Sequence, residues 1–151
     1  SITITEESIV RWVCDYINRK FGYIPTVGKR VMENRLDAYR ILFRNNTRVI
    51  MDGLDKSNSS NKFIPEGIFL SRPDIISSFL GGYFDGDAEV SDHDISATTK
   101  SNTLATQLTY LLLRLGISAS IRERVAGEKR EIFKVVRISG EDRIKLKNIK
   151  M

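Results

Sequence analysis

The chain has 151 residues, 41% of them hydrophobic and 28% charged, which is typical of a globular protein with a substantial core. No run reaches the roughly 18–20 apolar residues of a membrane span, and there is no signal-peptide pattern, so we expect no membrane partner and an intracellular, cytoplasmic location. Cys14 is the single cysteine and His93 the single histidine. This excludes an intrachain disulfide and a cysteine zinc site, and it excludes serine–histidine or cysteine–histidine catalysis unless His93 takes part.

The net charge of +5 is concentrated near the C-terminal end. Residues 122–151 hold ten basic side chains against five acidic ones, so the preceding residues sum to zero. A basic segment is consistent with a polyanionic partner such as nucleic acid, but a solvated basic tail would have the same composition. Charge alone leaves both interpretations open.

The first part of the chain predicts a strand, a helix and a hairpin. Apolar side chains at helical spacing over residues 7–21 predict a helix that Gly22 ends, because glycine readily adopts the left-handed conformation that closes helices. The apolar stripe of this helix consists of Ile9, Trp12, Val13, Tyr16 and Ile17. The other elements expected here are a strand at 1–6, hairpin strands at 23–31 and 38–44, and a short helix at 46–54.

The polar run at residues 55–61 predicts a linker, because it contains no apolar side chain and is rich in Ser and Asn. Beyond it the same order of elements returns. We expect a helix entered at Pro73, a strand at 94–99, a helix from a Ser101 or Asn102 cap to Leu115, strands at 117–125 and 132–139, and a helix from Glu141. Alternation in the strand at 117–125 places Ile117, Ala119 and Ile121 inward.

Residues 79–90 read Phe-Leu-Gly-Gly-Tyr-Phe-Asp-Gly-Asp-Ala-Glu-Val, which is unusual for an ordinary core helix. Gly82 and Gly86 lie on one helix face, where the missing side chains would let a second helix approach closely. Asp85 and Asp87 stand at the C-terminal end, where the helix macrodipole disfavours negative charge. A metal ion would reverse that penalty, so the segment predicts a helix that presents a carboxylate to a metal at a helix–helix interface.

Two other interpretations of this segment were weighed. One is a structural helix that simply ends in an acidic turn. The other is a calcium-binding EF-hand loop starting at Asp85, which requires glycine at its sixth position and glutamate at its twelfth. Those positions are Val90 and Ser96, so the sequence excludes the calcium loop.

Residues 80–88 resemble the signature nonapeptide of the LAGLIDADG homing endonucleases. Leu80, Gly82, Asp85 and Asp87 match that motif, and Ala88 stands in place of its final glycine. The resemblance covers nearly the whole chain and is closest to the two-motif endonucleases lodged in inteins, the protein-splicing elements. Splicing itself is not expected of this chain, which lacks the His-Asn end of an intein.

Similar residues also recur at a constant offset of 94 residues, which indicates an internal duplication. The pairs include Tyr16 with Tyr110, Gly22 with Gly116, Arg30 with Arg124, and the run at 39–42 with that at 133–136, without a gap. At this offset the partner of Asp87 would precede Ser1, so we expect a window cut from a longer two-motif protein. A protein that lost its first motif would have the same sequence pattern.

Together, the resemblance and the repeat imply an α+β fold, a homing-endonuclease-like pseudo-dimer of two αββαββα half-domains whose first helix is missing. The expected boundaries are a first half-domain without its motif helix at 1–55, a linker at 56–70 and a second half-domain with the motif helix at 71–151.

Metal-dependent phosphodiester hydrolysis suits the acids of the motif, because hard divalent cations prefer oxygen ligands. We expect Asp87 to be catalytic and a ligand of Mg²⁺ or Mn²⁺, with the backbone carbonyl of Gly86 as a second ligand and Asp85 as a structural cap. Gly82 and Gly86 would form the helix interface. A second acid would come from another motif-bearing segment or from a homodimer partner.

The segment Lys62-Phe63-Ile64-Pro65 is similar to a Lys-x-Ile-Pro pattern that the two-motif endonucleases carry ahead of their second motif. The resemblance implies that Lys62 is catalytic, as an electrostatic stabiliser or water-positioning group near the phosphate. Without the resemblance, Lys62 would be a solvated linker charge.

Double-stranded DNA is the expected partner, bound through phosphate contacts and through strand side chains that reach base edges. The DNA-binding residues expected are Arg30, Arg40, Arg44, Thr98, Lys100, Arg122, Arg124 and Lys134.

The sequence therefore predicts a homing endonuclease domain that performs sequence-specific double-strand cleavage and is inactive as this isolated piece. One alternative is a cleavage-incompetent DNA- or RNA-binding module of the same fold, such as a regulator or maturase-like protein. Another is a structural domain whose glycine-faced helix only dimerises, against which the basic strand residues argue.

Overall fold

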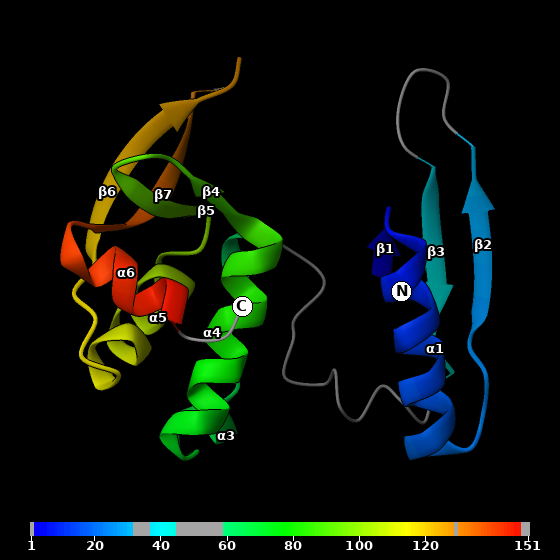
Figure 1. The fold of residues 1–151 in the computed structure, drawn as a ribbon. Helices are drawn as coiled ribbons and strands as arrows, with labels where there is room; N and C mark the ends of the chain where they lie inside the picture. Colours follow the sequence, from blue (N-terminus) through cyan, green and yellow to red (C-terminus); the bar gives the residue numbers. More distant parts are fainter. Residues whose placement is uncertain (1, 32–36, 45–58, 129, 149–151) are drawn as a thin grey trace. The chain divides into compact units, whose positions relative to one another are not determined.

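The computed structural model describes residues 2–31, 37–44, 59–128 and 130–148, and the chain divides into two units, Ser1–Asp52 and Gly53–Met151 (Figure 1). The first unit contains β1 (Ile2–Ile4), α1 (Glu7–Phe21), β2 (Thr26–Arg30) and β3 (Ala38–Leu42). The second contains a 3-10 turn η2 (Ser59–Asn61), α3 (Glu66–Phe69), α4 (Pro73–Asp87), β4 (Ala88–Val90), β5 (Asp94–Thr99), α5 (Asn102–Arg114), β6 (Ser120–Ala126), β7 (Glu131–Ser139) and α6 (Glu141–Asn148). The short helix expected at 46–54 lies outside the described residues.

In the first unit, helix α1 packs on an antiparallel sheet of order β1-β3-β2. The helix ends as expected at Gly22, whose φ of 68° is left-handed and whose amide donates to the carbonyl of Asn18 at 2.9 Å. Its buried side chains are Val10 and Ile17. Strand β3, which α1 contacts, contributes the fully buried Ile41.

The expected burial of the α1 stripe is only partly right. Ile17 is buried, but Trp12 is 60% exposed and stacks on Tyr16 with ring centroids 5.6 Å apart. Ile9 is also exposed. The buried face runs from Val10 to Ile17, so the stripe is rotated by one position from the one that the apolar pattern suggested.

The second unit is a four-stranded antiparallel sheet of order β4-β5-β7-β6, and α4, α5 and α6 lie against one face of it (Figure 1). Helix α5 starts at the N-cap Ser101, as expected, and supplies the centre of the core. The fully buried large side chains of this unit are Ile64, Ile76, Leu80, Ile95, Leu108, Leu111, Leu112, Ile117, Val136, Ile138 and Leu146. No helix in the part of the chain that the structure describes is long and apolar enough to cross a membrane.

Strand β6 differs from its expected burial. Ile117 is buried and Ala119 packs against the core. Ile121 faces the same side, as expected, because it pairs with the buried Val136, but its side chain is 39% exposed. The regular strand also begins at Ser120 rather than at Ile117. β6 is an edge strand of the sheet, so the helices cover the end of the strand that lies next to Ile117 and leave the rest exposed.

The predicted duplication is visible in the order of the strands, since β1-β3-β2 corresponds to β5-β7-β6. The gap-free offset is wrong in the last strand, however. Thr26 pairs with Leu42, whereas Ser120, 94 residues after Thr26, pairs with Arg137 rather than with Val136. The second hairpin thus holds one more residue. A shift of one residue reverses the face that each side chain occupies, so the extra residue alters which positions of β7 are equivalent to those of β3.

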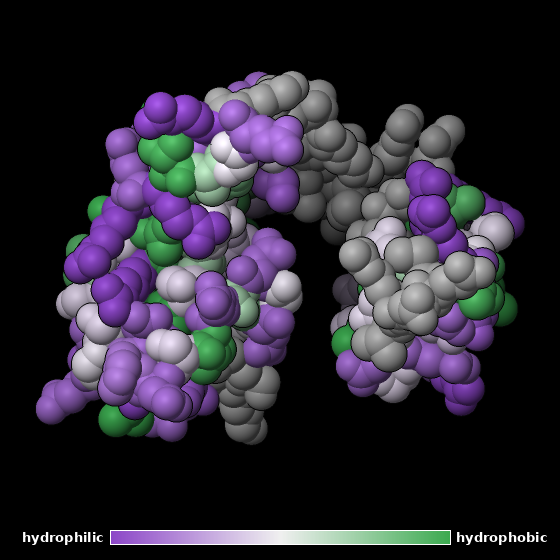
Figure 2. Space-filling model, turned by 90° about the horizontal axis from the view of Figure 1, so that it is seen from above, coloured by the Kyte–Doolittle hydropathy of each residue, from purple (hydrophilic) through white to green (hydrophobic). Residues whose placement is uncertain are grey.

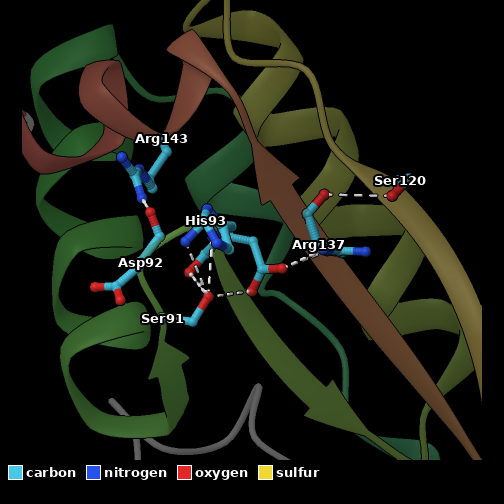
Figure 3. A network of polar contacts seen from close by, with 7 residues as sticks. Ser91, Asp92, His93, Ser120, Arg137 and Arg143 are labelled. Carbon is cyan, nitrogen blue, oxygen red and sulfur yellow. Dashed lines mark hydrogen bonds and ion pairs between the residues drawn. The ribbon is translucent and has the colours of Figure 1, made fainter.

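Polar contacts fix the turn between β4 and β5 to β7 and α6 (Figure 3). The Ser91 hydroxyl accepts a hydrogen bond from the amide of Asp94 at 3.1 Å. The Asp94 carboxylate pairs with Arg137 of β7, with Nε and Oδ2 2.7 Å apart. Arg143 of α6 donates to the carbonyl of Asp92. These contacts anchor the turn that joins β4 to β5 both to β7 and to α6.

Candidate functional site

A pocket of about 190 Å³ opens in the second unit where the end of α4 meets the end of β5. Its lining residues are Ser59, Lys62, Tyr83, Asp87, Thr98, Thr99, Lys100, Leu104 and Phe133. The two residues expected to be catalytic, Lys62 and Asp87, therefore share one cavity although 24 residues separate them in the sequence. The candidate DNA contacts Thr98 and Lys100 line it as well.

Asp87 is the last residue of α4 and its side chain is exposed. The helix begins at Pro73, whose fixed φ suits the first helical position, and it buries Ile76, Leu80 and Phe84 at intervals of four residues. This buried stripe fixes the rotation of the helix, so the C-terminal acid is directed to the pocket. An acid at this end of a helix is electrostatically unfavourable without a cation nearby.

Tyr83 lines the pocket one turn before Asp87 and packs edge-on against Phe84, with ring centroids 5.7 Å apart. Burial, followed by the negative charge of Asp87, raises the pKa of Tyr83 to about 12. The phenol is therefore neutral at physiological pH and presents an O–H group beside the carboxylate.

Lys62 belongs to a segment without helix or strand, and its backbone is held by two side chains of the α5 region. The hydroxyl of Ser101 donates to the carbonyl of Lys62 at 2.6 Å. The amide of Ile64 donates to Oε1 of Gln107 at 2.7 Å, and the Ile64 side chain is buried in the core. The sequence marked Ser101 only as a helix cap and gave no signal for Gln107.

The donor groups of the site fit a divalent metal ion in part. Asp87 supplies one carboxylate, and the carbonyl of Gly86 belongs to the last turn of α4, where carbonyls have no partner within the helix. Among the described residues, no group of three or more His, Cys, Asp or Glu side chains could hold a metal ion. Magnesium sites commonly use one or two carboxylates together with water and substrate phosphate oxygens, and Asp87 can supply one such carboxylate.

Gly82 and Gly86 lie on the exposed side of α4. A Cβ atom built at either glycine would meet no described atom within 4 Å. Ile75 and Ser78 continue the same exposed face toward the start of the helix. The face is thus open within the described part of the chain, and the helix interface expected there stays a prediction.

The sheet of the second unit has one face under the helices and one uncovered face. Arg122 and Arg124 of β6 lie on the uncovered face, opposite Val135 and Phe133 of β7, and both are exposed. No ion pair involves either arginine among the described residues. Thr98 pairs with Val135 and so lies on the same face. Seen from above, hydrophilic side chains cover most of the visible face of this unit (Figure 2).

Two of the expected DNA-binding lysines are engaged in ion pairs. Lys100 pairs with Glu131 at 2.7 Å and lies over the Phe133 ring, with Nζ 5.3 Å from its centroid. Lys134 pairs with Glu123 and shares its face of the sheet with Glu123 and Thr99. This is the face of the buried Val136, so the register separates Lys134 from Arg122 and Arg124.

In the first unit, Arg30 and Arg40 lie on the sheet face opposite to that of the buried Ile41, by the alternation of β2 and β3. Arg44 lies just beyond β3, with its guanidinium 5.0 Å from the centre of the Tyr23 ring.

Of the site residues that the sequence predicted, the structure brings Lys62, Asp87, Thr98 and Lys100 together in one pocket. The roles assigned to all these residues remain predictions.

The chain is similar to known proteins in sequence and in fold. The sequence model of the LAGLIDADG-like domain matches residues 74–149. The chain is 33% identical over 93 residues to the replication factor C small subunit of Methanocaldococcus jannaschii, covering 62% of this chain and 5% of that protein. It is 39% identical over 103 residues to the DNA polymerase of Thermococcus kodakarensis, covering 68% of this chain and 6% of that protein. The chain thus spans only a small part of these relatives.

Solved structures of the homing endonuclease I-DmoI are similar in fold. One, in complex with DNA and Mn, has a TM-score of 0.69 at 15% identity and covers 98% of this chain and 77% of that one. Another, of mesophilic variants, has a TM-score of 0.68 at 16% identity and covers 98% and 76%. The α+β fold predicted from the sequence is confirmed. The family match over residues 74–149, joined to this fold, shows that the chain belongs to the LAGLIDADG homing endonuclease family.

Proposed function

We propose that the chain is part of a two-motif homing endonuclease that cleaves double-stranded DNA at a specific site. The observation that carries the proposal is the meeting of Lys62 and Asp87 in one pocket, at the C-terminal end of a glycine-faced helix. A carboxylate and an ammonium group beside each other are the groups that phosphodiester hydrolysis needs for a metal and for the phosphate. Solved relatives of this fold include I-DmoI complexes with its target DNA and Mg or Mn, which supports the proposal.

Asp87 and the carbonyl of Gly86 would hold Mg²⁺ or Mn²⁺. Such an ion, when bound, supplies charge neutralisation and a more acidic bound water. Lys62 would stabilise the negative charge that develops on the phosphate oxygens, because its ammonium group is a compact point charge at the same cavity. Thr98 lines the same pocket, and its hydroxyl would donate to a phosphate oxygen.

The second carboxylate would come from another motif-bearing segment or from a second copy of the chain. The open face around Gly82 and Gly86 supports this, since two helices can approach closely only where side chains are small. We therefore propose that this chain as a monomer does not cut both DNA strands, because no group of three or more His, Cys, Asp or Glu side chains that could hold a metal ion surrounds Asp87 within the described residues.

DNA would lie on the uncovered sheet faces, with Arg122 and Arg124 as contacts from the second unit and Arg30 and Arg40 from the first. Arg122 and Arg124 carry no competing ion pair among the described residues, whereas Lys100 must exchange Glu131 for a phosphate. A function on cellular DNA implies an intracellular location, which we also propose.

An intein origin is the simplest source for such a chain. Relatives include a replication factor C subunit, a DNA polymerase and a subunit of A-type ATP synthase, which are three different proteins, and the matched part is 5–8% of each. A segment common to unrelated proteins behaves as an insertion rather than as part of any of them. Parent-gene sequence on both sides of the chain tests this inference, which fails if the flanks encode no split host protein.

The decisive test compares Asp87→Asn with Arg124→Ala in the natural protein that contains this chain. Asp87→Asn should abolish plasmid cleavage with nearly unchanged DNA affinity, because a neutral amide is a poor ligand for magnesium. Arg124→Ala should weaken binding and lower the slope of log K against log salt by about one contact. Arg72→Ala is the control, since Arg72 precedes α4 and pairs with Asp74.

Full cleavage by the Asp87→Asn protein would refute its assignment as a metal ligand. Binding without cleavage by the unmodified protein, over a range of magnesium and manganese concentrations, would establish the cleavage-incompetent module instead. Comparing DNA with RNA of the same sequence in these binding assays distinguishes the two kinds of binding module.

A further inference from the structure

We infer that Ser101 and Gln107 are positioning residues that hold Lys62 at the pocket, an inference that rests on the proposed role of Lys62 in cleavage. Residues 62–65 form neither helix nor strand, so their own backbone does not fix where Lys62 lies. Contacts with the α5 region must do so.

The Ser101 hydroxyl makes two hydrogen bonds, one as acceptor and one as donor. It accepts from the amide of Leu104 at 3.1 Å, which caps α5, and it donates its single proton to the carbonyl of Lys62 at 2.6 Å. The amide of Ser101 in turn donates to Oγ1 of Thr99, a residue of the pocket, at 3.1 Å. One buried hydroxyl thus joins the start of α5 to the segment that carries Lys62.

Ser101 has no exposed surface, so water cannot replace its hydroxyl without rearrangement. Removing the hydroxyl would leave both the Lys62 carbonyl and the Leu104 amide without this partner. A serine that only capped a helix would not need the second bond, which crosses 39 residues of sequence.

Gln107 holds the other side of the same segment. Its Oε1 accepts from the amide of Ile64 at 2.7 Å, and the Ile64 side chain is buried in the core. The backbone is therefore fixed immediately after Lys62 and again two residues later, on the same helix. These two hydrogen bonds lie on either side of Phe63. They hold the backbone that follows Lys62 and leave the Lys62 side chain able to move.

The first experiment needs no activity and uses the 151-residue chain. Its lysines are reductively methylated with ¹³C-formaldehyde, and the Lys62 signal is assigned by its loss in Lys62→Arg. Ser101→Ala and Gln107→Met should shift and sharpen the Lys62 signal. Thr106→Ala should leave it unchanged, because Thr106 lies on the same helix and its hydroxyl, among the described residues, bonds to the Asn102 carbonyl within α5.

Gln107→Met leaves the cap of α5 intact, so it tests the inference even if Ser101→Ala does not fold. Ser101→Thr should restore the unmodified signal, because threonine supplies a hydroxyl at the same place. A Lys62 signal that is the same in Gln107→Met, Ser101→Ala and Thr106→Ala would overturn the inference.

The second experiment measures single-turnover cleavage by the natural protein that contains this chain. Ser101→Ala and Gln107→Met should each lower the rate by about tenfold, the usual effect of removing a group that orients a functional residue. Neither should lower it further in a Lys62→Met background, since coupled residues are not additive. Equal losses with and without Lys62 would overturn the positioning role, as would a responsive NMR signal with an unchanged rate. A responsive signal in a protein that never cleaves would refute the proposed function and leave the anchoring of Lys62 in place.

Discussion

Asp94 and Arg137 form an ion pair across β5 and β7, with Arg137 Nε 2.7 Å from Asp94 Oδ2. The carboxylate side chain is 18% exposed and that of the arginine 34%. Summed over both partners, this exposure is lower than in the Lys100–Glu131 pair or the Lys134–Glu123 pair of the same sheet. It ties β5, the second strand after the motif helix, to its neighbour β7 in the middle of the sheet (Figure 3).

This pair predicts an acid-sensitive contribution to stability. The hydrogen bond from Arg137, followed by that from Ser91, holds the pKa of Asp94 below its usual value. A carboxyl group whose pKa is lowered in the folded state stabilises the protein above the unfolded-state pKa of about 3.9, and that stability is lost as the pH falls through the folded pKa. Arg137→Met should therefore lower the unfolding temperature at pH 7 more than at pH 3.

The measurement is thermal unfolding followed through the amide resonances of β5 and β7, which report on the second unit alone. Arg122→Met is the matched control, because Arg122 lies on the neighbouring strand without an ion pair among the described residues. An equal effect of Arg137→Met at both pH values would show that the pair does not couple to folding.

The core of the second unit depends on the buried face of α5. Leu108 has no exposed surface, whereas Leu113 on the same helix is 63% exposed. Leu108→Ala should lower the free energy of unfolding by about 2–5 kcal/mol, because it removes apolar contacts and leaves a cavity. Leu113→Ala should change it by no more than about 0.5 kcal/mol. Urea denaturation with a probe in the second unit distinguishes the two, and comparable losses would mean that α5 is rotated from its described position.

The glycine face of α4 gives a prediction in which stability and association change in opposite directions. Gly82→Ala should stabilise the helix by roughly 0.5–1 kcal/mol, because a Cβ there meets no described atom within 4 Å. The same methyl group should weaken pairing of this face with another helix, and so lower cleavage by the natural protein. Gly67→Ala in α3 is the control, since it too has free space for a Cβ but lies outside the face. Unchanged cleavage by the Gly82→Ala protein would argue against a helix interface at this position.

Tyr83 should titrate late and respond to Asp87. Burial and the charge of Asp87 raise its pKa to about 12. Since the unfolded-state value is about 10, stability should fall as the pH rises from about 10 to about 12, and Tyr83→Phe should remove that loss. Asp87→Asn should lower the pKa, because the repulsion of the phenolate disappears. Phenolate absorbance against pH measures both, with Tyr110→Phe as the control for an exposed tyrosine. An unchanged pKa of Tyr83 in the Asp87→Asn protein would show that burial alone raises it.

Much of the candidate site followed from local sequence. The motif helix, its acidic end at Asp87 and the left-handed stop at Gly22 depend on residues that are near neighbours in the chain, so periodicity and capping rules reach them. The association of Lys62 with Asp87 came from a resemblance, and the pocket now places both residues on one cavity. Neither periodicity nor spacing could have shown that the two residues line one pocket.

Other features were decided by contacts between distant segments. Trp12 is exposed although its spacing fits the apolar stripe, because the sheet meets α1 along Val10 and Ile17. Ile121 is exposed although alternation places it inward, because β6 is an edge strand. The one-residue register difference between the hairpins also escapes a comparison of side-chain types, since similar residues align at an offset of 94 although the strand pairing differs by one residue.

The sequence by itself determined the family, the α+β fold and the order of most elements, because these follow from short-range patterns of apolar, glycine and acidic residues. It missed the short α3 and β4. Only the tertiary structure decided that Ser101 and Gln107 anchor the Lys62 segment, and that Lys134 faces away from Arg122 and Arg124. The physical reason is that a hydrogen bond across 39 residues, or the face a strand residue occupies, depends on register and packing that no local stretch of chain encodes.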